Sequence, residues 1–332
     1  MTTQHTKSSC CQAPVRRYGE RRRQCCQCLT TWRLSPHKQG RKRKRYSRNL
    51  LSKVLLQAQS VNDQLVNYPD LTLNGLQKRV QRLVQSAATR PRDYPQLRGQ
   101  YILIGDGLWY RLDNQDWVLY LFLLKPRRRN YAYLLDPLIL PGKESFANWQ
   151  MAIETIPNNI KERILAFVSD AFRASDKIIR HYQWLHQLCH FHLIAELQKR
   201  RGRKKKTIAG KSIREAIYQI IVQLLQADQP KQIKRLKAQL QRLTAKSECP
   251  GKLGMIAREF LKHFDKYQTF LNRPDLTIPR TTSAAESLGK LIRRRTRPLN
   301  TPQAIQEWAT AFVRLKRTMN CNGQNSIKNQ PN

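Results

Sequence analysis

Acidic residues are scarce in this chain. Its 332 residues include 22 Asp and Glu against 62 Lys and Arg, which gives a formal net charge of +40. Such an excess of positive charge repels itself unless a polyanion neutralises it. The charge balance therefore favours nucleic acid as the partner, with an anionic membrane surface as the rival.

Long hydrophobic runs are also missing. The longest unbroken apolar run spans residues 117–124 and is closed by Lys125, Pro126 and Arg127, so it is too short to cross a bilayer. The polar N-terminus does not resemble a signal peptide. These absences argue against a membrane protein, and we expect a cytoplasmic protein associated with the nucleoid.

The eight cysteines are unevenly distributed, because five of them lie in the first 28 residues. A secreted disulfide framework would spread its cysteines along the chain. In a basic segment of a cytosolic protein, such a cluster instead favours a zinc site.

The sequence pattern divides the chain into four parts. Residues 1–48 form a basic head that carries the cysteine cluster, and residues 49–94 have helical periodicity. Residues 95–315 alternate strand-like runs, at 101–104, 117–124, 131–135 and 164–168, with helix-like segments, the last at 302–315. This order predicts an α/β domain with an all-helical insertion at about 195–275. Residues 316–332 are expected to be a disordered tail.

Two basic segments before the α/β domain are candidates for DNA binding. In the helical region, apolar residues recur at three- and four-residue steps on both sides of a break at residues 67–70, and Lys78, Arg79 and Arg82 share the opposite face of the second helix. This pattern fits either a helix-turn-helix or an ordinary packed pair of helices. The preceding basic run fits either a solvated linker or an arm that follows phosphates; it consists of Arg41, Lys42, Arg43, Lys44 and Arg45.

Three acidic residues stand out against the basic background. Asp106 and Asp170 each end an apolar, strand-like run, and Glu286 opens a helix-like segment rich in arginine. Two carboxylates at strand ends and one on a helix can hold a pair of Mg²⁺ ions against a phosphodiester. Taken singly, strand-terminal Asp and helical Glu are common in turns and helices without any catalytic role.

The order of these acids and their neighbours is more specific. Asp106 is followed by Gly107, Asp170 precedes the segment 189–192 (Cys-His-Phe-His), and Glu286 lies in the segment 281–288 (Thr-Thr-Ser-Ala-Ala-Glu-Ser-Leu). Three arginines trail this last segment: Arg293, Arg294 and Arg295. Over residues 95–315 this set resembles the DDE transposases of the bacterial mutator-type group, relatives of the eukaryotic MULE elements. One departure is Ser283, where the family has Asn.

The resemblance implies a fold, a cofactor and a reaction. The fold would be a ribonuclease H-like catalytic domain interrupted by a helical insertion. Asp106, Asp170 and Glu286 would bind two Mg²⁺ ions, which cut the ends of a mobile element and join them to target DNA. Cys189 and His192 match a Cys-x-x-His pair of the family. We expect them on one side of a helix, either packed beside the active site or, with His186 or His190, bound to a metal.

The head is similar to the second half of a transposase zinc ribbon. Cys25 and Cys28 have the spacing that tetrahedral zinc prefers, and Trp32 follows them. Cys11 matches the family's second ligand, but Ser8 stands where the first is expected, so Cys10 or His5 is a substitute. Cys26 is not expected to be a ligand. Unliganded thiols in a disordered head are the alternative.

The sequence thus predicts a DNA transposase. Its partners would be the double-stranded DNA of the element ends and of the target, held by the head, the helical region, residues 199–206 and residues 290–297, and the chain would act as a homodimer or higher oligomer. An inactive or domesticated transposase that only binds DNA is the alternative. A ribonuclease H-like nuclease directed at RNA is a third reading.

Overall fold

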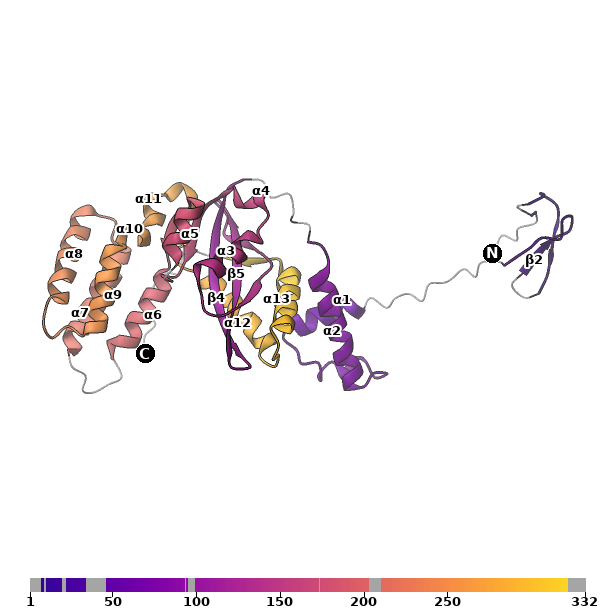
Figure 1. Ribbon diagram of the computed structural model, residues 1–332, viewed down its shortest axis with the longest axis horizontal. Coiled ribbons are helices and arrows are strands. Elements are labelled where there is room, and N and C mark those ends of the chain that lie inside the picture. The colour runs from indigo at the N-terminus through magenta and orange to yellow at the C-terminus, as the bar shows by residue number, and fades with distance from the viewer. Residues whose placement is uncertain are drawn as a thin grey trace. The chain divides into compact units, whose positions relative to one another are not determined.

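The computed structural model describes residues 7–8, 10–19, 22–33, 46–92, 94, 99–172, 174–202 and 210–321 (Figure 1). The chain forms two compact units, Met1–Leu51 and Ser52–Asn332. None of the helices in these described ranges is both long and apolar enough to cross a membrane.

The first unit contains a small antiparallel sheet in the order β1-β2-β3. Its strands are β1 (Val15–Arg17), β2 (Arg22–Cys25) and β3 (Thr31–Arg33). The turn between β2 and β3 is closed by two backbone hydrogen bonds, from Leu29 N–H to Cys25 O (3.1 Å) and from Cys25 N–H to Thr30 O (3.0 Å). This turn brings Cys25 and Cys28 close together.

The second unit is built on a mixed sheet, so the chain is an α/β protein. The described strands follow the order β10-β6-β5-β4-β8-β9, and β7 pairs with β5. β4 is antiparallel to β5 and parallel to β8, which is parallel to β9. The strands are β4 (Tyr101–Leu112), β5 (Gln115–Pro126), β6 (Tyr131–Leu134), β7 (Leu138–Pro141), β8 (Ile164–Ser169), β9 (Leu185–Leu188) and β10 (Thr318–Asn320).

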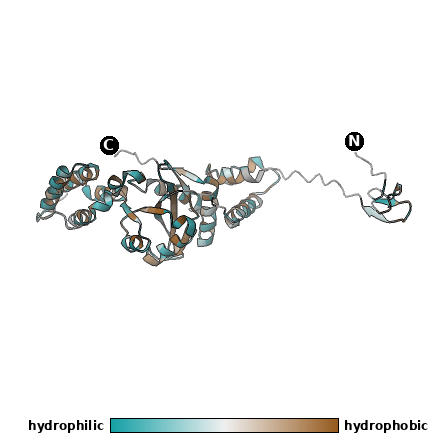
Figure 2. Cartoon of the chain, turned by 90° about the horizontal axis from the view of Figure 1, so that it is seen from above, coloured by the Kyte–Doolittle hydropathy of each residue, from teal (hydrophilic) through white to brown (hydrophobic). Residues whose placement is uncertain are grey.

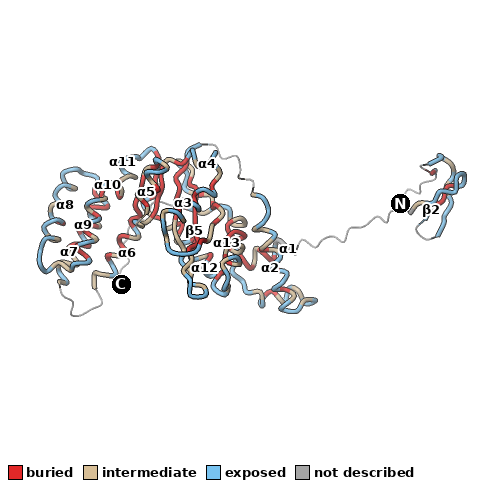
Figure 3. Tube along the Cα trace, in the orientation of Figure 1, coloured by how far each residue is buried: buried red, intermediate tan, exposed pale blue. Residues whose placement is uncertain are grey.

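Helices cover both faces of this sheet. One face packs on α3 (Phe146–Glu154) and α5 (Ser175–Tyr182), where Trp149 is fully buried among the aromatic residues of the strands. The other face packs on α12 (Ser283–Thr296) and α13 (Pro302–Lys316). Hydrophobic and buried residues accordingly line the strands of this sheet (Figures 2 and 3). The short helix α4 (Asn158–Lys161) leads into β8.

The helical segment after β9 has its own core. Its first four helices are α6 (His190–Arg201), α7 (Lys211–Gln226), α8 (Pro230–Thr244) and α9 (Gly251–Lys262). They bury a cluster that includes Leu197, Leu224 and Phe260. The chain returns to β9 through α10 (Phe264–Tyr267), α11 (Thr269–Asn272) and the 3-10 turn η2 (Pro274–Leu276). These elements occupy the region where the sequence predicts a helical insertion.

The region whose pattern fits either a helix-turn-helix or a packed pair of helices is less regular than that pattern predicts. α1 (Tyr46–Leu55) ends early, and a 3-10 turn, η1 (Leu65–Asn67), precedes α2 (Leu73–Thr89). Thr72 caps α2 by accepting a hydrogen bond from Gly75 N–H (3.2 Å). α2 packs on α13 through Leu76, Val80 and Val84, and it leaves its basic side chains exposed.

Three short strands and one long hairpin differ from the sequence-based expectation. The pattern misses β7 and β9, and β10 lies within the tail expected to be disordered, where it pairs with β6. Residues 322–332 lie outside the described residues. β4 continues to Leu112 because every residue from Gly105 onward pairs with β5, and Asp113 and Asn114 close the hairpin with φ values of 47° and 62°.

We predict that Gly105→Ala destabilises the second unit by about 1–3 kcal/mol. A Cβ atom at this position would lie 2.7 Å from Phe167 Cε2 and 3.1 Å from Trp149 Cζ3, so the aromatic core must shift. Urea unfolding measures the change. Gly251→Ala, where an added Cβ has no neighbour within 4 Å, is the control and should change the free energy of unfolding little. Equal effects of both substitutions would contradict the packing described here.

Candidate metal and nucleic-acid site

Asp106 lies in β4, and Asp170 directly follows the neighbouring parallel strand β8. Ile104 of β4 pairs with Val168 of β8; Asp106 is two residues after Ile104, and Asp170 is two residues after Val168. Residues two apart on a strand share a face, so both carboxylates extend to the face covered by α12. Asp170 directly follows β8, as predicted. Asp106, however, lies inside β4, because β4 continues beyond it as one arm of the hairpin. The expectation that Asp106 ends its strand is wrong.

Glu286 reaches the same place from the first turn of α12. Helix α12 packs on β4 and β5, and Gly289 lies next to Leu121, because a Cβ added there would be in ordinary van der Waals contact with Leu121 Cδ1 (3.5 Å). Leu121 is the direct partner of Asp106 in the hairpin. The Oε1 atom of Glu286 is buried and has no hydrogen-bond partner.

The acids influence one another strongly. The pKa of Asp106 is raised to about 8, first by burial and then by the charges of Asp170, Glu286 and Glu144 in that order, while a hydrogen bond from Gly107 N–H opposes the shift. Burial raises the pKa of Asp170 to about 6. The pKa of Glu286 is also raised, first by burial, although His192 and Lys290 oppose the shift. Like charges held together in a buried place favour a cation between them.

Glu144 is a further acid that the sequence analysis missed. It follows β7, and its Oε1 and Oε2 atoms accept hydrogen bonds from Trp109 Nε1 (2.9 Å) and Trp149 Nε1 (3.3 Å). A Cβ at Gly107 would meet Glu144 Oε1, the end of a flexible side chain, so a larger residue after Asp106 would require Glu144 to move. Because Gly107 and Asp106 face opposite sides of β4, Glu144 adds charge from the other face. Gly107, directly after Asp106, is the sequence feature that could have indicated a side chain packed close to the strand here.

Cys189 and His192 do lie at this site, but not on one side of a helix. Cys189 precedes α6 with an extended backbone, and His192 lies in the first turn of that helix. His192 Nε2 lies 3.6 Å from Glu286 Oε1. Ligand atoms of Cys189, His192 and Glu286 all lie within 4.8 Å of one another. The other two histidines considered as ligands point elsewhere: His186 hydrogen-bonds Ser169 Oγ (3.0 Å), and His190 Nε2 lies 2.8 Å from Tyr267 O.

The three arginines of α12 do not form one basic surface. Arg293 and Arg294 are exposed, and Arg293 donates a hydrogen bond to Trp109 O (2.7 Å). Arg295 is 7% exposed and donates to the backbone oxygens of Leu55, Leu56 (2.9 Å) and Leu291 (2.6 Å). The expectation that Arg295 binds DNA is therefore wrong, because its guanidinium is used up by carbonyl groups inside the protein.

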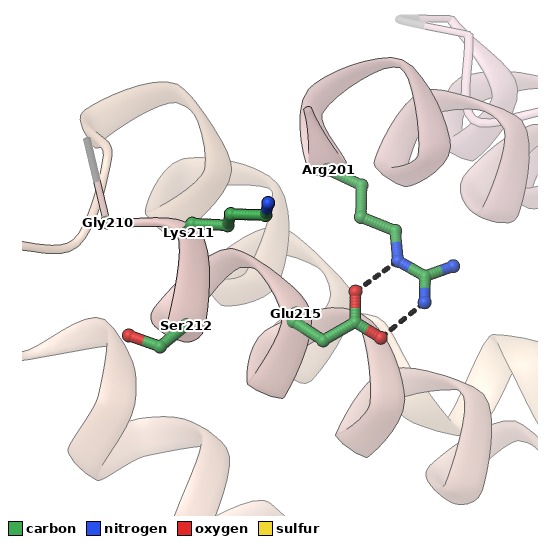
Figure 4. Close-up of a pocket in the computed structure, with 5 residues that line it drawn as sticks. All are labelled: Arg201, Gly210, Lys211, Ser212 and Glu215. Carbon is green, nitrogen blue, oxygen red and sulfur yellow. Dashed lines mark hydrogen bonds and ion pairs between the residues drawn. The ribbon is translucent and has the colours of Figure 1, made fainter. Parts of the chain in front are cut away.

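The other predicted basic segments are only partly described. Residues 41–45 and 203–206 lie outside the described residues. In the described part of the second segment, Arg200 and Lys199 pair with Glu196. Arg201 pairs with both oxygens of Glu215, next to a pocket that Gly210, Lys211 and Ser212 also line (Figure 4). These ion pairs reduce the charge that residues 199–201 can offer to phosphate.

In the first unit, four cysteines gather as a site able to hold a zinc ion. The Sγ atoms of Cys10, Cys11, Cys25 and Cys28 all lie within 4.8 Å of one another, and Cys10 and Cys28 are 3.4 Å apart. Cys10 thus takes the place expected for the fourth ligand. Ser8 is buried and accepts a hydrogen bond from Cys11 N–H (3.3 Å), and Cys26 is exposed outside the cluster. His5 lies outside the described residues.

The cysteine cluster has the electrostatics of a metal site. Hydrogen bonds from Thr30 lower the pKa of Cys28 to about 6, whereas hydrogen bonding to Cys28 raises the pKa of Cys11 to about 12. Because zinc binds thiolates, its binding would release the protons of thiols such as Cys11 and replace the hydrogen bonds among the sulfurs with metal–sulfur bonds.

No model of a known protein family matches the chain, and no curated protein matches it.

We predict a pH-dependent loss of stability that Asp106 causes. Above about pH 4 the unfolded chain releases the Asp106 proton, whereas the folded chain keeps it up to about pH 8, so stability falls with rising pH between these values. Asp106→Asn should remove this loss, with a slope difference of at most about 1.4 kcal/mol per pH unit. Urea unfolding of both proteins without added Mg²⁺, from pH 4 to pH 8, measures it. A difference in stability that does not change with pH would refute the buried environment of Asp106.

We predict that the full chain binds one zinc ion through Cys10, Cys11, Cys25 and Cys28. Cys10→Ser should remove the zinc or weaken it by at least about 100-fold, because one thiolate of the tetrahedral set is lost. Cys26→Ser is the matched control and should keep one equivalent. Metal analysis after dialysis against a competing chelator gives the readout, and retained zinc in Cys10→Ser would exclude Cys10 as a ligand.

Proposed function

We propose that the protein is a DNA transposase of the mutator-like DDE type. The observation that carries this proposal is the convergence of Asp106, Asp170 and Glu286 on one face of the sheet. The three acids come from two neighbouring strands and one helix, although 64 and 116 residues separate them along the chain. Asp106 feels the charge of both other acids.

The sheet supports a ribonuclease H-like fold for this domain. Three antiparallel strands, β6, β5 and β4, are followed by β8 and β9, which run parallel to β4. The helical segment α6–α11 then separates the second acid from the third. This arrangement supports the ribonuclease H-like fold that the sequence resemblance implies.

The donor set of the site fits magnesium. All three side chains offer hard oxygen ligands, and Glu286 Oε1 is a buried acceptor without a hydrogen bond, which a cation would satisfy. When bound, two Mg²⁺ ions would activate the attacking water or hydroxyl and stabilise the leaving 3′ oxygen. Asp106 and Asp170 fix the ligand positions through strand backbone, and Glu286 closes the site from α12.

Double-stranded DNA is the substrate that the charge favours. Arg293 and Arg294 are exposed on the helix that carries Glu286, and Lys78, Arg79 and Arg82 are exposed on α2. Exposed lysine and arginine bind phosphates without reading sequence. In the proposal, the zinc-binding head and α2 hold the ends of the mobile element.

The direct test uses a supercoiled plasmid that carries the genomic DNA from both sides of the coding sequence. With Mg²⁺ or Mn²⁺, the protein should cut it at the element ends. Asp106→Asn, Asp170→Asn and Glu286→Gln should each reduce cleavage by more than about 100-fold, which exceeds the usual cost of losing a group that only supports a ligand. Mobility-shift assays should show unchanged DNA binding.

Asp136→Asn is the control for these acid-to-amide changes, because Asp136 pairs with Arg92 and Arg314 away from the three acids. It should keep cleavage wherever it remains folded. Footprinting without nicking by the wild-type protein would instead favour an inactive transposase that only binds DNA. Cleavage of the RNA strand alone in an RNA–DNA duplex would favour the nuclease reading.

A further inference from the structure

The thiol of Cys189 contacts the start of the helix that carries Glu286. Its Sγ atom accepts hydrogen bonds from the N–H and the Oγ1–H of Thr282, both at 3.2 Å. Cys189 is 2% exposed and Thr282 is completely buried. Thr282 immediately precedes α12, and its carbonyl oxygen accepts a hydrogen bond from Glu286 N–H (3.0 Å). The sulfur therefore fixes the residue on which the first turn of α12 is built.

The backbone of Cys189 is fixed on the other side by the strand that leads to Asp170. Cys189 N–H donates to the carbonyl oxygen of Ser169 (2.8 Å), the residue before Asp170. The next residue is tied to the segment before α12, because His190 N–H donates a hydrogen bond to Arg280 O (3.0 Å). One residue thus connects the end of β8 with the start of α12.

His192 adds a contact to the Glu286 carboxylate itself. Its Nε2 atom lies 3.6 Å from Glu286 Oε1, and its Nδ1 atom lies 3.5 Å from Thr282 Oγ1. The first distance is longer than a hydrogen bond, so Oε1 keeps its lone pairs for another partner. His192 restricts where the carboxylate can move without occupying the oxygen.

We propose that Cys189 is a positioning residue which, with His192, holds Glu286 at a fixed place relative to Asp170. The proposal rests on the proposed function, since it assigns a role within that metal site. Zinc ligation by Cys189, His192 and Glu286 is the competing explanation. The contacts favour positioning, because the sulfur already accepts two hydrogen bonds from Thr282.

The experiment uses the full, zinc-loaded chain and three variants. Cys189→Ala removes the acceptor, Cys189→Ser restores a smaller one, and Cys321→Ser is the matched control, because Cys321 is also buried (5% exposed) but contacts the backbone near β10. Mn²⁺ affinity is measured by electron paramagnetic resonance without DNA. Cleavage kinetics give kcat, KM for DNA and the Mg²⁺ requirement.

Cys189→Ala should weaken Mn²⁺ binding about 10- to 100-fold, the usual cost of losing a group that orients a metal ligand. It should raise the Mg²⁺ requirement and lower kcat, with KM for DNA unchanged. Cys189→Ser should recover most of the affinity, and Cys321→Ser should match the wild type. Hydrogen exchange at residues 283–288 should be faster in Cys189→Ala.

Three results would overturn the inference. The first is that folded Cys189→Ala binds Mn²⁺ with an affinity within about twofold of the wild type, instead of the 10- to 100-fold weaker binding expected. The second is a second zinc equivalent that Cys189→Ala loses, which would establish ligation instead. The third concerns the case in which Cys189→Ala does not fold. Thr282→Val, which removes one donor to the sulfur, is then used instead, and Mn²⁺ affinity equal to that of the wild type would overturn the inference. Wild-type protein that neither binds Mn²⁺ nor cuts DNA would instead reject the proposed function.

Discussion

The second unit holds three carboxyl groups close together in a place that is largely buried from water. Asp106, Asp170 and Glu286 each have a raised pKa, and burial is the first cause in every case. Such a group of buried acids lowers the stability of the folded state, since each negative charge repels its neighbours. The surrounding structure must therefore hold the acids in place: β4 and β8 fix two of them by backbone register, and α12 brings the third. The convergence has a physical purpose if a divalent cation completes it, which is the basis of the proposed function.

The supports around this group share a common design. Residues next to the acids in the chain hold their surroundings in place. Gly107 N–H donates to Asp106 Oδ1 (3.0 Å), Ser169 O accepts from Cys189 N–H, and Thr282 donates to the same cysteine. Glu286 Oε1 is left without a hydrogen-bond partner. The first unit solves a different problem, because three strands of three or four residues have almost no hydrophobic core. There the four clustered thiols form a site where a bound zinc ion would stabilise the fold.

Several features were open to prediction because they depend on local chemistry. Regular apolar spacing identified the strands around residues 101–104 and 117–124 and the helix after Pro302. The spacing of Cys25 and Cys28 identified them as candidate zinc ligands. Other features depend on distant pairing. β9 and β10 are too short to show a pattern, and Gly105 and Gly107 resemble a strand end until the complete hairpin is seen. Arg295 looks like its exposed neighbours in the sequence, yet it is buried because the carbonyls of Leu55 and Leu56 lie opposite.

The sequence by itself determined the charge, the alternation of helices and strands, and the three candidate acids with their order. These properties follow from residue type and spacing, which act over a few residues at a time. Only the tertiary structure decided that Asp106 and Asp170 share a register, that Cys10 joins the other thiols, and that Cys189 touches Thr282 across 93 residues. Such contacts depend on strand pairing and helix packing between distant segments. The free energy that selects them comes from the whole core, so no local pattern can encode them alone.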